Sequence, residues 1–204
     1  MRFGRVEVTG GFFLLLAWMN YLDHSFLVPM SLVACAVHEL GHIMAIRLLG
    51  GDVKEIYITA IGAELVLDYP LGYWQEGVSA LAGPGSNLLL AWICCNFEKG
   101  LAFAGLNLAL AVFNLLPVYR LDGGRALHCT LSLLASPETA ERLGAWLDCL
   151  CTVGALAAGL ALTLLGGNFT LLLVAFWLLI CVLKQNIYPY RKNRACQRGR
   201  KKVQ

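Results

Sequence analysis

The chain has 204 residues, of which 58% are hydrophobic and only 14% are charged, with a formal net charge of +3. Soluble domains carry about 25% charged residues, so this composition excludes an ordinary soluble protein and indicates an integral membrane protein. Seven of the 16 Lys and Arg residues lie after Tyr190. We expect residues 191–204 to form a disordered, basic cytoplasmic tail. A basic run of this kind beside a membrane span favours contact with anionic lipid over nucleic acid, and we expect no nucleic-acid partner.

Six apolar segments approach the length that a helix needs to cross about 30 Å of hydrocarbon. They lie near residues 9–22, 26–49, 77–97, 100–119, 145–166 and 168–186. Six spans place both termini on one side, and if that side is the cytoplasm, Lys99 is the only external cation. The positive-inside rule therefore favours a multi-pass protein of the cell membrane with both termini in the cytoplasm. The first span has one alternative, a signal peptide, although no small-x-small cleavage site follows it.

The one sizeable segment outside these spans covers residues 50–76. Within it, KEIYITAIGAELVLDY alternates in places and is rich in β-branched and aromatic residues. This pattern predicts a short β-hairpin at about 50–70, on the cytoplasmic side. The predicted fold is therefore an all-α integral membrane bundle of six transmembrane helices with a short hairpin, and residues 1–190 form its single domain. None of the eight cysteines forms a CxxC pair with metal or disulfide spacing.

Two histidines and a glutamate lie within the second span, in the sequence ACAVHELGHI at 34–43. Ionisable side chains in a bilayer are costly and usually face a protein interior, where they do chemistry. On a helix, His38 and His42 project from one face about a turn apart, which lets two imidazoles bind one tetrahedral zinc ion. Glu39 points to the side of that pair and could take a proton from water that the metal activates. The alternative is a set of histidines that only form hydrogen bonds between helices, with a paired glutamate.

A zinc hydrolase needs a third protein ligand and leaves the fourth position to water. The best candidate is Asp122 in FNLLPVYRLDGGRAL, where polar residues, a proline and two glycines interrupt an apolar span. The helix should break there, and a non-helical backbone at membrane depth is tolerated only where it lines protein or a wet cavity. Asp122 would then be presented to a site. Glu64 and Asp68 remain rival ligands, although both lie in the predicted hairpin near the surface.

Three motifs together resemble those of the site-2 proteases, which are intramembrane zinc metalloproteases. They are HELGH at 38–42, LAGPGSN at 81–87 and NLLPVYRLDGG at 114–124. The resemblance covers roughly residues 10–186 and is closest to the compact bacterial type typified by a sporulation protease that processes a membrane-tethered sigma-factor precursor. It implies that His38, His42 and Asp122 bind Zn²⁺ and that Glu39 acts as general base and acid. The family usually has a second proline three residues after the position of Pro117, where this sequence has Arg120.

Asn87 and Asn114 resemble asparagines that the family has near its site. By that resemblance they could donate hydrogen bonds to the developing oxyanion or hold the substrate backbone. The alternative is that they form hydrogen bonds between helices, as asparagine in membrane helices often does. Gly83, Gly85 and Ser86 favour close packing of helices over a chemical role, and Gly41 adds no bulk, so another helix or a substrate could come close to it.

The sequence thus predicts a zinc metalloprotease that hydrolyses a peptide bond in or near a transmembrane segment of a membrane-tethered protein, with a sigma-factor precursor as one candidate substrate. The expected partners are that protein and the lipid bilayer, and an inhibitory membrane protein is a further candidate partner. The alternative function is a membrane metal transporter or a metal-binding scaffold. A transporter would need further polar residues along a path across the membrane, and the first, third, fifth and sixth predicted spans offer almost none.

Overall fold

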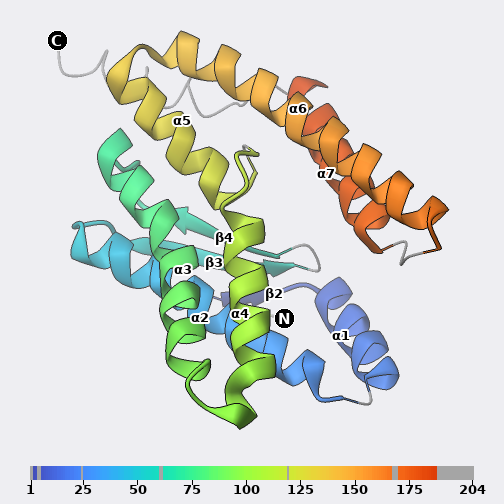
Figure 1. The fold of residues 1–204 in the computed structure, drawn as a ribbon. Helices are drawn as coiled ribbons and strands as arrows, with labels where there is room; N and C mark the ends of the chain where they lie inside the picture. Colours follow the sequence, from blue (N-terminus) through green and yellow to red (C-terminus); the bar gives the residue numbers. More distant parts are fainter. Residues whose placement is uncertain are drawn as a thin grey trace, which may run out of the picture.

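The computed structural model describes residues 2–3, 6–23, 25–59, 62–118, 120–166 and 170–187, which form helices and one small sheet (Figure 1). The basic tail predicted at 191–204 lies outside the described residues. The helices are α1 (Gly10–Leu22), α2 (Leu27–Leu48), α3 (Tyr73–Cys94), α4 (Leu101–Asn114), α5 (Asp122–Leu134), α6 (Pro137–Leu164) and α7 (Thr170–Ile187), with a short 3₁₀ turn, η1 (Glu98–Gly100), before α4.

Three of these helices, α2, α3 and α6, are long and apolar enough to cross a membrane, judged by length and composition. They correspond to the second, third and fifth predicted spans. Helices α1 and α4 have 13 and 14 residues. At 1.5 Å per residue they are only about 20 Å long, less than the hydrocarbon thickness. The count of six spans therefore stays a prediction.

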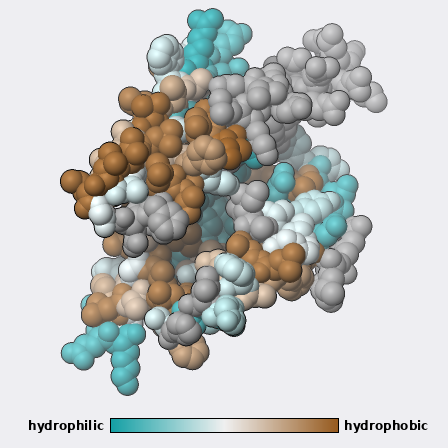
Figure 2. Space-filling model, turned by 90° about the vertical axis from the view of Figure 1, so that its right-hand side faces the viewer, coloured by the Kyte–Doolittle hydropathy of each residue, from teal (hydrophilic) through white to brown (hydrophobic). Residues whose placement is uncertain are grey.

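Large apolar side chains cover much of the outer surface of the helices. Trp92, Trp146 and Leu150 are 69%, 77% and 69% exposed, and Figure 2 shows hydrophobic residues spread over much of one face. A soluble monomer rarely exposes apolar patches of this extent. The surface agrees with a helical fold that is embedded in a membrane.

The sheet has four strands in the order β1 (Arg2–Phe3), β2 (Val6–Val8), β3 (Val53–Thr59) and β4 (Gly62–Leu67). Strands β3 and β4 are antiparallel, which confirms the predicted hairpin, while its cytoplasmic placement stays a prediction. Strand β2 pairs with β3 in parallel, and this pairing was not predicted. A strand of three residues is too short to show a period of two, and its partner lies far along the chain.

The chain leaves the helical conformation between α4 and α5, as the sequence predicted. Residues 115–118 and 120–121 are not helical, and two tight turns shape them: the Val118 N–H donates to Leu116 O and the Leu121 N–H to Val118 O, both at 2.8 Å. Val118 and Leu121 are buried against Leu178 of α7. This packing anchors the segment that leads into Asp122. Helix α5 itself was not predicted.

Helices α2 and α3 pack closely along one stripe of α2. The buried residues of α2 are Ala34, His38, His42 and Ile46, four residues apart and therefore on one face. Gly41 lies beside this stripe, and a Cβ atom there would come within 2.7 Å of the Ala82 carbonyl oxygen on α3. The glycine lets α3 approach α2, so the two histidines lie in a tight interface between helices.

Candidate metal centre

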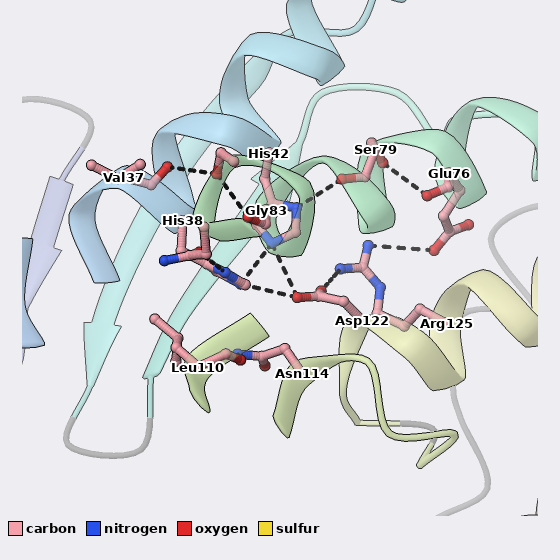
Figure 3. Close-up of polar contacts among 12 residues, drawn as sticks. Val37, His38, His42, Glu76, Ser79, Gly83, Leu110, Asn114, Asp122 and Arg125 are labelled. Carbon is pink, nitrogen blue, oxygen red and sulfur yellow. Dashed lines mark hydrogen bonds and ion pairs between the residues drawn. The ribbon is translucent and has the colours of Figure 1, made fainter. Parts of the chain in front are cut away.

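Three side-chain atoms from two distant parts of the chain meet at one point, as Figure 3 shows. The Nε2 atoms of His38 and His42 lie 3.1 Å apart, and they lie 3.0 and 3.2 Å from Oδ2 of Asp122. All three residues are buried. Among the residues that the structure describes, no other group of His, Cys, Asp and Glu side chains is spaced to hold a metal ion. The structure thus brings together the three residues predicted as ligands.

The outer ring nitrogens of both histidines face carbonyl oxygens. His42 Nδ1 lies 2.7 Å from the backbone oxygen of Ser79, and His38 Nδ1 lies 2.8 Å from Oδ1 of Asn87. Two acceptors orient the Asn87 amide, because its Nδ2 donates to the backbone oxygen of Ala34 at 3.1 Å and to Oδ1 of Asn107 at 2.7 Å. A carbonyl oxygen can only accept, so each Nδ1 carries the hydrogen and each neutral ring has its lone pair on Nε2.

The converging atoms are therefore two lone-pair nitrogens and a carboxylate oxygen, with no hydrogen to share among them when the rings are neutral. Buried acceptors that face one another without a donor are unfavourable, and a cation between them removes the conflict. A tetrahedral zinc ion with bonds of about 2.0–2.2 Å separates its ligand atoms by about 3.4 Å. The observed separations of 3.0–3.2 Å lie within a few tenths of an ångström of that value. These three atoms fit zinc as ligands and leave the fourth position of the tetrahedron open.

Asp122 is the first residue of α5, and a second set of contacts orients its carboxylate. Its Oδ1 lies 3.5 Å from Nη1 of Arg125, one turn further along α5, and Nη2 of Arg125 lies 3.8 Å from Oε1 of Glu76 on α3. The Arg125 side chain is 41% exposed, so these long ion pairs add little stability. They hold Oδ1 on the arginine side and leave Oδ2 for the histidines.

Two glycines make room for the ligands. A Cβ atom at Gly83 of α3 would overlap the imidazole of His42, lying 2.9 Å from its Cδ2. At Gly123, a Cβ atom would overlap the backbone of Leu115. Gly83 therefore lets the imidazole of His42 pack directly against the backbone of α3. Gly123 lets the first turn of α5 pack directly against the backbone of Leu115. By contrast, a Cβ atom at Gly85 would have no atom within 4 Å.

The remaining predicted site residues take different places. Glu39 follows His38 on α2, is partly buried and stays outside the group of three converging atoms. Asn114 ends α4 and donates within its own helix, to Leu110 O at 3.0 Å. The rival ligands Glu64 and Asp68 are exposed. The metal-ligand group does not include either of them.

Asn87 does not have a free donor for an oxyanion. Its Nδ2 donates to Ala34 O and, at 2.7 Å, to Oδ1 of Asn107, while its Oδ1 accepts from His38. The alternative of hydrogen bonding between helices therefore describes Asn87, and its contact with His38 makes it a support of the metal centre. Sequence reasoning missed Asn107 and Ser79. Asn107 could have been found, because it is a polar residue in an apolar span. Ser79 could not, because it acts through its backbone oxygen, which every residue type has.

Comparisons with known proteins show a similar sequence and a similar fold. No family model matches the sequence. The chain is similar to "Putative zinc metalloprotease sll0528" of Synechocystis sp., with 31% identity over 182 residues that cover 79% of this chain and 46% of that protein. The chain thus spans about half the length of this curated relative. It is also similar to a solved structure, the site-2 protease from Methanocaldococcus jannaschii, with a TM-score of 0.66 and 22% identity over 90% of this chain and 92% of that one. The chain therefore has the fold of a site-2 protease, and its residues His38, His42 and Asp122 are spaced so that they could hold a metal ion.

Proposed function

We propose that the chain belongs to the site-2 protease family and is an intramembrane zinc metalloprotease. Its reaction is the hydrolysis of a peptide bond in or near a transmembrane segment of a membrane-tethered protein. One observation carries the proposal: three acceptor atoms converge within 3.2 Å beside an apolar helix long enough to span a membrane, and Glu39 of that helix stays outside the group. The zinc metalloprotease name of the Synechocystis relative supports it.

Each residue of the site has its own role in the proposed reaction. His38 and His42 offer Nε2 as ligand atoms because their Nδ1 hydrogens are donated to carbonyl oxygens, and Asp122 offers Oδ2. These three residues would hold the zinc ion, whose contribution there would be to activate a water molecule and to polarise the scissile carbonyl. Glu39 takes the proton of the attacking water and returns it to the leaving amine.

A substrate helix must unwind before its backbone is open to attack, because its peptide groups are hydrogen-bonded within the helix. Strand β4 is the last strand of the sheet, so its outer edge could pair with the unwound segment. Leu65→Pro on β4 removes a strand donor, and cleavage at the wild-type rate in that variant would count against this role of the hairpin.

We also propose a membrane topology, a substrate and a partner for the protein. The chain is multi-pass with both termini in the cytoplasm, and a membrane-tethered sigma-factor precursor is the first substrate to offer. We further propose that another membrane protein binds the protease and inhibits it. These points rest on the predicted spans, the placement of the cations and the motif resemblance.

The test is to measure zinc content and cleavage of a model tethered substrate by detergent-purified wild type and Glu39→Gln. Wild type should hold one zinc ion per chain and cut the substrate. Glu39→Gln should keep its zinc and lose activity by about 10²–10⁴-fold, the usual contribution of a general base. A Glu39→Gln variant that cuts at the wild-type rate would overturn the mechanism. Wild type that carries zinc into liposomes without hydrolysing the substrate would favour the transporter.

A further inference from the structure

We propose that Asn107 is a positioning residue of the metal centre: it holds the Asn87 amide, and through that amide it fixes the tautomer and the ring orientation of His38. The inference rests on the proposed zinc site and extends it to α4, a helix that supplies no ligand. Asn107 itself contacts neither the ligand atoms nor the position of a substrate.

A continuous path of hydrogen bonds joins α4 to the ligand. Asn107 Nδ2 donates to the backbone oxygen of Phe103 at 2.9 Å, and Asn107 Oδ1 accepts from Asn87 Nδ2 at 2.7 Å. Asn87 Nδ2 also donates to Ala34 O at 3.1 Å. Its Oδ1 accepts from His38 Nδ1 at 2.8 Å. The path therefore passes from α4 through α3 to α2 and ends on the imidazole.

The chemistry of the path permits one direction only. The Phe103 oxygen is a backbone acceptor, so the NH₂ end of Asn107 must face it and the Oδ1 end must face Asn87. Rotating the Asn107 amide by half a turn would set its NH₂ group against the NH₂ group of Asn87. The acceptor end of Asn87 is thereby directed at His38, which must donate from Nδ1 and leave Nε2 free for the metal.

Burial makes the path hard to replace. Asn87 and Asn107 are both 0% exposed. Inside a membrane bundle, bulk water cannot supply a hydrogen bond to a polar group that has lost its protein partner. Without the Asn107 acceptor, Ala34 O alone holds the Asn87 amide, and that amide can tilt away from the ring. His42 has no such dependence, since a backbone oxygen holds its Nδ1.

The test compares Asn107→Leu with wild type in the full chain. Leucine has a similar size and removes the acceptor. The rescue variant is Asn107→Asp, because a buried aspartate favours its neutral form, which can donate to Phe103 O and accept from Asn87. Asn107→Ser, whose hydroxyl is too short to replace the amide, stands in if the leucine variant fails to fold. The matched control is Asn96→Leu, an exposed asparagine just after α3 that donates to Trp92 and Ile93 carbonyls.

Two readouts are needed, the zinc dissociation constant from competition with a chelator and the ¹⁵N NMR shifts of the labelled histidines in zinc-free protein. Asn107→Leu should bind zinc about 10–100-fold more weakly, as expected for loss of outer support to a metal ligand. Its His38 signal should shift from the Nδ1–H tautomer to a mixture of tautomers, while Asn107→Asp and Asn96→Leu stay close to wild type.

Wild-type zinc affinity together with an unchanged Nδ1–H tautomer in Asn107→Leu or Asn107→Ser would overturn the inference. Failure of the proposed function looks different, because wild type itself would then bind no zinc. Even in that case the tautomer readout decides the role of Asn107, since it is made on zinc-free protein.

Discussion

The substitution Gly83→Ala tests the packing of the metal centre with a single added methyl group. On α3, the new Cβ atom would overlap the imidazole of His42 and lie 2.9 Å from its Cδ2. Carbon atoms pack at about 3.5–4.0 Å, so the ring has to move by roughly 1 Å. The methyl group cannot turn away, because the helix backbone fixes its direction.

This movement is large on the scale of metal coordination. Ligand distances in zinc sites hold within about 0.2 Å, and His42 Nδ1 is tied to Ser79 O at 2.7 Å. A ring that shifts by roughly 1 Å breaks that hydrogen bond, leaves coordination range, or does both. We expect zinc binding to weaken by about 100-fold or more, at or above the upper end of the range for lost support of a ligand.

The assay is a zinc titration against a competing chelator, run together with thermal unfolding. The matched control is Gly85→Ala, two residues further along α3, where a Cβ atom meets nothing within 4 Å. Alanine is the better helix former by about 1 kcal/mol. Gly85→Ala should therefore keep or raise the melting temperature and leave zinc affinity unchanged. If Gly83→Ala binds zinc as tightly as wild type, the close contact between α3 and His42 is not a feature of the protein.

Three further outcomes follow from the same geometry. Gly123→Ala forces a methyl group into the backbone of Leu115, so we expect destabilisation by about 1–3 kcal/mol in chemical unfolding, together with loss of zinc. Arg125→Met removes a long, partly exposed ion pair to the carboxylate ligand; zinc affinity measured by chelator competition should fall by less than about tenfold, since exposed pairs contribute about 0–1 kcal/mol. Glu64→Gln and Asp68→Asn alter exposed side chains outside the ligand group, and zinc content measured by mass spectrometry should stay at the wild-type value in both.

The local part of the site could be predicted from sequence. The spacing of His38 and His42 fixes their relation as soon as the segment is helical, because the helix itself sets the geometry. The break before Asp122 was predictable for a similar reason, since Pro117 has no backbone N–H to donate and disfavours a helix locally, whereas the glycine pair lies in the first turn of α5. The structure places Arg120, where the family usually has a second proline, in an exposed turn. The break forms without that proline.

The support of the site could not be predicted, because it depends on which helices meet. That Asn87 holds His38 while Asn114 bonds within its own helix follows from the rotation of α3 and α4, and two asparagines look alike in sequence. The pairing of β2 with β3 has the same origin. It joins segments about 50 residues apart through backbone hydrogen bonds, which leave no mark on residue type.

The most direct test of the proposed zinc centre is zinc-edge X-ray absorption on the purified wild-type protein, with the metal counted on the same sample. We expect one zinc ion per chain, bound by two imidazole nitrogens and by oxygen at about 2.0–2.2 Å. A protein without stoichiometric zinc would contradict this expectation. So would a zinc ion with sulfur ligands at about 2.3 Å, because the metal would then be held by cysteines and not by His38, His42 and Asp122.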